Sequence, residues 1–116
     1  VLDGCDAART IVNAGATGDG IGAVYALARE RGFATTGICS TLARDAGLAV
    51  APQVQRVFWV DDNRWGGIDP ATGRLSPTSQ AMVEASDRIV AIGGGGIARD
   101  ECLAARAAGK PVVFLP

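Results

Sequence analysis

Four consecutive glycines at positions 93–96 stand between an apolar segment and a helical pattern. The segment before them, residues 88–92 (RIVAI), predicts a strand, and residues 97–108 predict a helix. Gly109 then occupies a helix-cap position, Lys110 and Pro111 are stop signals, and residues 112–115 (VVFL) predict another strand. This order indicates two strands joined by a glycine-rich turn and a helix.

A second unit of the same kind lies near the start of the chain. Residues 10–15 (TIVNAG) and 34–40 (ATTGICS) predict short strands bounded by turn residues. Between them, four residues share one face at helical spacing: Ile21, Val24, Tyr25 and Ala28. Gly32 follows where a C-terminal cap belongs, so the segment predicts a βαβ unit.

The middle of the chain continues the alternation. Residues 41–46 predict a short helix and residues 56–60 (RVFWV) a strand rich in aromatic and β-branched side chains. The polar residues 61–75 predict a loop. Ser76 followed by Pro77 is typical of a helix N-cap and first turn, and opens a predicted helix through about residue 85.

Strands that alternate with helices predict a parallel sheet with helices on its faces. We therefore expect an α/β fold, a Rossmann-like three-layer sandwich whose mainly parallel sheet has about five strands. At 116 residues, with 48% hydrophobic and 20% charged residues, the chain suits one ordered domain over 1–116. It begins at Val1 instead of a methionine and stops at Pro116, which leaves room for flanking segments.

Composition excludes several classes of function. A net charge of −1 without a cluster of Lys or Arg argues against a nucleic-acid partner. No apolar run reaches the roughly 20 residues of a membrane span, and we expect a cytoplasmic protein without a membrane partner. The three cysteines form no CxxC pair, and histidine is absent, so Ser-His-Asp chemistry is excluded and no metal site is predicted.

The two glycine-rich loops carry the main functional hypothesis. In open α/β sheets ligands bind beyond the carboxyl ends of the strands, where glycine turns lead into helix N-termini that attract anions. We expect these loops to bind a phosphate-bearing small molecule, such as a nucleotide or a nucleotide-like ligand. No cofactor is assigned. The predicted ligand-binding residues are Gly15, Ala16, Thr17, Gly18, Gly20, Gly93, Gly94, Gly95, Gly96, Ile97 and Arg99.

Two familiar subtypes do not fit the first loop, GATGDGIG. A P-loop would carry lysine and a hydroxyl residue where Ile21 and Gly22 stand, so nucleoside triphosphate hydrolysis of that type is disfavoured. The dinucleotide fingerprint GxGxxG is also absent, which disfavours NAD or FAD chemistry. The alternative that both loops are only tight turns remains open.

The ordered motifs resemble the SLOG superfamily, which includes the lysine-decarboxylase-like phosphoribohydrolases and the molybdenum cofactor carrier-like proteins. The resemblance covers roughly residues 10–116 and rests on GATGDGIGAV, TGICSTL, the Met82, Ser86 and Asp87 pattern, and IGGGGIARD at 92–100. It implies that the second glycine loop binds a nucleotide phosphate. It also implies that an acid on the following helix acts on the N-glycosidic bond.

Carried over by position, the acid of that family falls on Asp100, with Glu101 beside it, and these are the candidate catalytic residues. One residue along a helix turns the side chain by about 100°, so the two acids are not interchangeable. Ile97 stands where the family has threonine. Thr78 and Ser79 stand where it has arginine and lysine, and these departures favour a binder over a hydrolase.

Other polar residues have two interpretations each. Asp19 is typical of a turn aspartate but suits a ribose hydroxyl too. Trp65 with Arg64 would either stack on a base and clamp an anion, or anchor the long loop. The adjacent Asp61 and Asp62 form only a weak metal pattern.

The leading hypothesis is a nucleotide-binding SLOG-type protein that acts as a binder, carrier or sensor. Its alternative is a nucleoside 5′-monophosphate phosphoribohydrolase that releases base and ribose 5-phosphate. A third possibility is an assembly domain whose glycine loops are turns. We also expect a homo-oligomer, because a small sheet covered by small-residue helices would gain from a partner.

Overall fold

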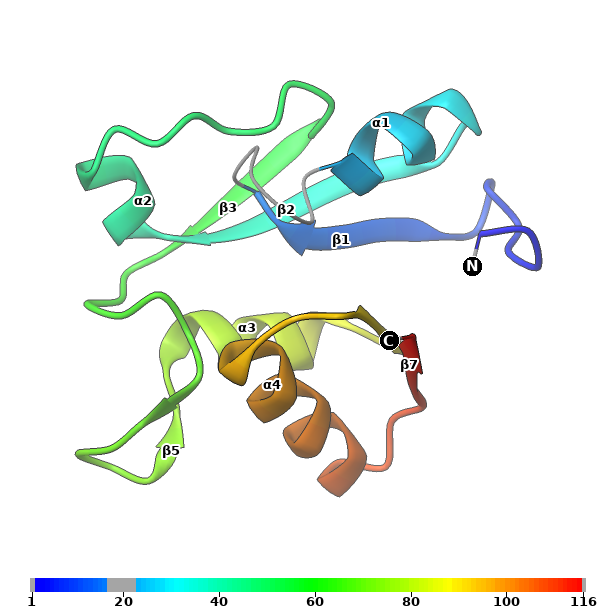
Figure 1. Ribbon diagram of the computed structural model, residues 1–116. Helices are drawn as coiled ribbons and strands as arrows, with labels where there is room; N and C mark the ends of the chain where they lie inside the picture. The colour runs from blue at the N-terminus through cyan, green and yellow to red at the C-terminus, as the bar shows by residue number, and fades with distance from the viewer. Residues whose placement is uncertain (1, 17–22, 116) are drawn as a thin grey trace. The chain divides into compact units, whose positions relative to one another are not determined.

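A computed structural model describes residues 2–16 and 23–115 of the chain. The chain divides into two units, Val1–Trp59 and Val60–Pro116, and each is described by itself. Both contain helices and parallel strands, which confirms the α/β class (Figure 1). In the described part of the chain, no helix has the length and apolarity that a membrane span requires.

The first unit holds a three-stranded sheet in the order β1-β2-β3. Strands β1 and β2 pair in parallel, from Ile11 opposite Ala34 to Gly15 opposite Ile38. The strands and helices of this unit are β1 (Ile11–Gly15), α1 (Ala23–Glu30), β2 (Ala34–Ser40), α2 (Thr41–Asp45) and β3 (Arg56–Val60). Strands β1, β2 and β3 therefore form where the apolar pattern predicts them.

Helix α1 is amphipathic and lies along β1 and β2 (Figure 1). Tyr25 and Ala28, two members of the predicted helical face, are fully buried. The amide of Phe33 bonds to the carbonyl of Ala28 at 2.9 Å, and Gly32 adopts φ +83°, a conformation that glycine accepts without strain. The predicted cap therefore ends the helix and leads directly into β2.

A small core fixes the end of β1 against β2 and α2. Ala16, Cys39 and Ala43 are buried together, and Val50 and Val57 pack against them. Gly37 has no room for a side chain, since a Cβ there would lie 2.7 Å from Cβ of Ala16. Close packing at this point explains why β2 carries a glycine in its centre.

The second unit holds two sheets of two strands each. Strands β6 and β7 are parallel, from Ile89 opposite Val112 to Ile92 opposite Leu115, and α4 connects them. Strands β4 and β5 form a small antiparallel hairpin. The unit's strands and helices are β4 (Ile68–Asp69), β5 (Arg74–Leu75), α3 (Pro77–Ala85), β6 (Ile89–Ile92), α4 (Gly96–Ala107) and β7 (Val112–Leu115).

One local prediction needs correction. The polar segment 61–75 is not entirely loop, because it contains the β4–β5 hairpin, whose two-residue strands are too short to produce an alternating pattern. Ser76 does occupy the N-cap position of α3, but its side chain makes no capping hydrogen bond. The described strands form one sheet of three strands and two sheets of two strands each. The sequence predicts a single sheet of about five strands instead.

Candidate functional site

The second glycine loop joins β6 to α4. The amide of Gly93 donates to the carbonyl of Leu115 at 2.7 Å and so extends the pairing of β6 with β7. Gly94 has φ +102°, and a Cβ there would lie 2.8 Å from Cβ of Ala98. Gly93 also has a positive φ, of 62°. Gly93 and Gly94 therefore both require glycine because their φ angles are positive. Gly94 requires it also because no space is left for a side chain.

Beyond this turn, the N-terminus of α4 is open. Gly95 is the N-cap residue with extended backbone, offers no side chain, and is followed by a first turn without an acidic residue. Its carbonyl accepts from the amide of Arg99 at 3.1 Å, which closes the first helical turn. The amides of Gly94, Gly95, Gly96 and Ile97 make no hydrogen bond with another described residue. This arrangement is suited to an anion.

Two predicted ligand residues on α4 differ in their surroundings. The Arg99 side chain is 75% exposed, and its Nε lies 3.9 Å from Oδ1 of Asp100, a distance of weak ion pairing. Ile97 contacts the loop before β4, because its Cγ2 lies 3.1 Å from where a Cβ of Gly66 would be. Arg99 is thus free to turn toward an anion, whereas Ile97 supports a neighbouring loop.

Asp100 is engaged in holding the hairpin. Its side chain is 17% exposed, and its Oδ2 accepts a hydrogen bond from the amide of Ile68 at 3.0 Å. Gly67 lies against the same oxygen, with the site of an added Cβ only 3.2 Å away. The carboxylate that the resemblance assigns to chemistry therefore has a structural partner in this unit.

Glu101 faces a buried serine that the sequence analysis did not assign a functional role. Ser79 is fully buried, and its Oγ accepts from the amide of Gly67 at 2.7 Å. Burial raises the pKa of Glu101, a hydrogen bond with Ser79 opposes that rise, and the charge of Asp100 adds to it. Glu101 is consequently a candidate for holding a proton in this unit. In the sequence, the Gly66–Gly67 pair is the feature that could have predicted this close packing.

Residues of the first glycine loop belong to the other unit. Gly15 ends β1 opposite Ile38. Ala16 is buried, its amide donates to the Cys39 thiol, and its carbonyl accepts from the amide of Ala51 at 2.8 Å. The predicted binding residues Thr17, Gly18 and Gly20, together with Asp19, lie outside the described residues.

Asp62 has a different role from the metal pattern considered for it. It is 7% exposed, and its Oδ2 accepts from both the amide and the hydroxyl of Thr78 in the first turn of α3. Its Oδ1 accepts from the amide of Arg64 at 3.0 Å. Within the described ranges, no group of three or more potential metal ligands of the His, Cys, Asp or Glu type occurs.

The second unit thus brings together Gly93–Gly96, Ile97, Arg99, Asp100 and Glu101 on one loop and one helix. Trp65, the aromatic side chain of the long loop, is 51% exposed.

Comparison of the sequence with known protein families, with curated proteins and with solved structures found no match. The functional argument accordingly rests on the geometry and on the motifs.

Proposed function

We propose that the chain binds the phosphate group of a nucleotide or nucleotide-like molecule at Gly93–Gly96 and the N-terminus of α4. In this proposal it is a SLOG-type binder, carrier or sensor built on a Rossmann-like frame of about five strands. A ligand role for the first glycine loop, from Gly15 to Gly20, stays a prediction from the sequence. A cytoplasmic setting and a homo-oligomeric state are part of the same proposal.

The observation that carries the proposal is the open set of amides from Gly94 to Ile97. A helix N-terminus has several N–H groups without an intrahelical partner, and proteins usually satisfy them with a side-chain cap or an acidic first turn. Neither is present at α4. A phosphate oxygen would accept these hydrogen bonds and interact favourably with the helix dipole.

Gly95→Asp is a direct test, because it supplies a permanent carboxylate at the same place. A Cβ at Gly95 would meet nothing within 4 Å, and its φ of −116° suits an ordinary residue. The variant should be more stable, by about 0.5–1 kcal/mol in urea unfolding, since it adds an N-cap. It should also bind AMP at least tenfold more weakly by isothermal titration calorimetry, since the carboxylate competes with phosphate.

Gly95→Ala is the matched control, because it adds a Cβ without a charge or a cap. It should retain AMP affinity within a few-fold. If the wild-type protein shows no saturable heat with AMP, or if Gly95→Asp binds AMP as well as Gly95→Ala does, phosphate binding at this helix is refuted.

The raised pKa of Glu101 favours a second candidate, the phosphoribohydrolase. Burial raises the pKa of Glu101 above its ordinary value, which suits a group that holds a proton for transfer to a leaving base. Incubation with AMP and purine analogues should then release free base, and release should vanish in Glu101→Ala and in Asp100→Ala. Thermal stabilisation by AMP without turnover would instead favour the binder.

The assembly domain is the remaining candidate. It predicts that no phosphate compound shifts the midpoint of thermal unfolding. The same measurement that tests the binder therefore tests this candidate.

A further inference from the structure

Strand β3 is an open edge of the sheet in the first unit. The strand order β1-β2-β3 leaves one side of β3 without a neighbouring strand among the described residues. Such an edge presents a row of backbone N–H and C=O groups with which another extended segment can pair. Proteins often protect an edge with proline or lysine, and β3, with the sequence RVFWV, has neither. The edge is therefore suited to pairing with another chain.

Two aromatic side chains of β3 are exposed, one on each face of the strand. Val57 packs on the buried core of the unit, so the alternation of a strand places Trp59 on the same face and Phe58 on the other. Phe58 is 48% exposed and Trp59 is 38% exposed. A strand bound beside β3 would cover part of both rings, and cross-strand contacts with aromatic side chains stabilise a sheet.

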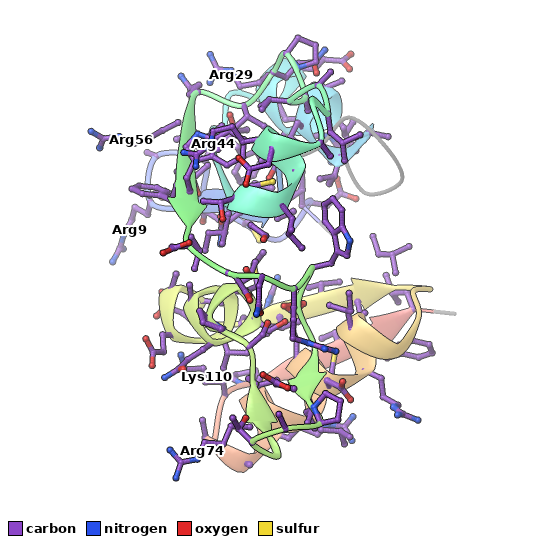
Figure 2. The ribbon with its side chains drawn as sticks, turned by 90° about the vertical axis from the view of Figure 1, so that its left-hand side faces the viewer. Arg9, Arg29, Arg44, Arg56, Arg74 and Lys110 are labelled. Carbon is purple, nitrogen blue, oxygen red and sulfur yellow. The ribbon has the colours of Figure 1, made fainter. Side chains whose placement is uncertain are left out.

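Each of these two rings has an arginine over it. The guanidinium carbon of Arg56 lies 5.7 Å from the centre of the Phe58 ring. That of Arg44, on α2, lies 5.9 Å from the centre of the Trp59 ring. Figure 2 shows both arginine side chains on the first unit beside β3. A cation–π contact attracts the positive charge to the ring and requires none of the five N–H donors of the guanidinium group, so these donors can serve a second partner.

The charges at this edge match an acidic partner. Strand β3 contains Arg56 and no acidic residue. Arg44 has Asp45 near it, with 3.6 Å between Nε and Oδ1, and an exposed ion pair of this kind contributes little. A second copy of β3 would bring no carboxylate to the two arginines. An acidic segment would bring carboxylates that accept charge-assisted hydrogen bonds from both of them.

We infer that the open edge of β3 binds an extended acidic segment of a partner protein, which adds to the sheet as a further strand and places carboxylates on Arg44 and Arg56. Neighbouring residues of a strand face opposite sides, so two adjacent acids would reach the arginines on the two faces of β3. A nucleic acid would also meet the arginines and the rings, but it has no peptide backbone to pair with the edge. This surface goes beyond the proposed phosphate site, and either can fail without the other.

The probe is the peptide Ac-Glu-Glu-Val-Val-Glu-Glu-amide, added to the full chain and followed by ¹H–¹⁵N NMR. Its paired glutamates present a carboxylate on each face, whichever way the peptide runs along β3. Saturable shifts are expected at the backbone amides of Phe58 and Trp59. Arg56→Glu and Arg44→Glu should each weaken binding about tenfold, since a repulsive charge replaces an attractive one. Arg74→Glu, the same change in the exposed hairpin of the second unit, is the matched control and should bind the peptide as the wild type does (Figure 2).

A second peptide separates strand addition from simple attraction of charge. Ac-Glu-Glu-Pro-Pro-Glu-Glu-amide has the same charge, but its prolines lack the N–H groups that a β-ladder needs, and it should cause no saturable shift in β3. The inference is overturned if the valine peptide causes no saturable shift, or if the proline peptide or oligouridylate shifts the β3 amides as strongly. It is equally overturned if Arg56→Glu binds the valine peptide as well as Arg74→Glu does. A change of oligomeric state in Arg56→Glu, measured by sedimentation equilibrium, would assign the edge to a second copy instead.

Discussion

Asp62 caps helix α3 from outside the helix, because its Oδ2 accepts from the amide of Thr78 at 3.0 Å and from the Thr78 hydroxyl at 2.7 Å. Ser76 occupies the N-cap position but makes no capping hydrogen bond with its side chain. The carboxylate that caps the helix lies fourteen residues earlier in the chain. The charge of Asp62 also lies at the positive end of the helix dipole. The segment before β4 is in this way tied to the start of α3.

The first prediction concerns the contribution of this cap. Asp62→Ala should lower the free energy of unfolding by about 1–3 kcal/mol, because the amide and hydroxyl of Thr78 lose their buried partner. Urea unfolding at neutral pH measures the loss. Asp61→Ala, at the exposed neighbouring residue, is the control and should change stability by less than about 0.5 kcal/mol.

The same cap gives a pH dependence. Burial would raise the pKa of Asp62, but the hydrogen bonds from Thr78, with help from Ser76 and Arg64, bring it below its ordinary value. A carboxyl group with a lowered pKa in the folded state stabilises the fold above its unfolded pKa, and this is lost as pH falls through the folded pKa. Asp62→Asn should therefore flatten the acid limb of the stability curve. An unchanged acid limb would contradict the prediction.

Glu101 is predicted to act in the opposite direction. Burial is the main reason that the pKa of Glu101 is raised, so its ionised form is disfavoured in the folded state. Stability from this group is present below its unfolded pKa and declines as pH rises through the folded pKa. Glu101→Gln should raise the midpoint of thermal unfolding at neutral pH and bring no gain at pH near 4. A matching decrease at both pH values would argue that Glu101 is ionised and paired instead.

Tyr25 allows a spectroscopic prediction, because it is the chain's single tyrosine. Its hydroxyl accepts from the amide of Ala14 at 3.0 Å and donates to the carbonyl of Thr36 at 2.8 Å. Burial raises the pKa of Tyr25 to about 12. The absorbance of tyrosinate should consequently appear near that pH, with a midpoint at the ordinary value near 10 only once the chain unfolds.

Replacement of this tyrosine tests the bridge that it forms. Tyr25→Phe leaves the Ala14 amide and the Thr36 carbonyl without the hydroxyl between them. The expected loss is about 1–3 kcal/mol in the free energy of unfolding. A loss below about 0.5 kcal/mol would show that water replaces the hydroxyl at no cost.

Gly37 provides a packing prediction. Gly37→Ala should destabilise the protein by about 1–3 kcal/mol, since the new Cβ would lie 2.7 Å from Cβ of Ala16 and 3.2 Å from the Tyr25 hydroxyl. Gly4→Ala is the control, because a Cβ there meets nothing within 4 Å. Denaturant unfolding of both variants measures the difference, and equal stability of the two would contradict the packing argument.

Local patterns in the sequence were enough to predict the α/β class and most of its strands and helices. The segments at 34–40, 56–60 and 112–115 form strands with the predicted bounds, and Gly32 and Gly109 end their helices with positive φ. These features depend on hydrophobic periodicity and on backbone conformations that few residues besides glycine adopt, and neighbouring residues encode both. The open N-terminus of α4 was predictable for the same reason.

Tertiary structure alone decided which polar groups have partners. The sequence shows Asp100 and Glu101 as adjacent acids, but folding pairs Asp100 with the amide of Ile68 and sets Glu101 beside Ser79. The cap of α3 by Asp62 likewise joins residues that are far apart in sequence. Hydrogen bonds act over about 3 Å in space, whereas a sequence pattern records only separation along the chain.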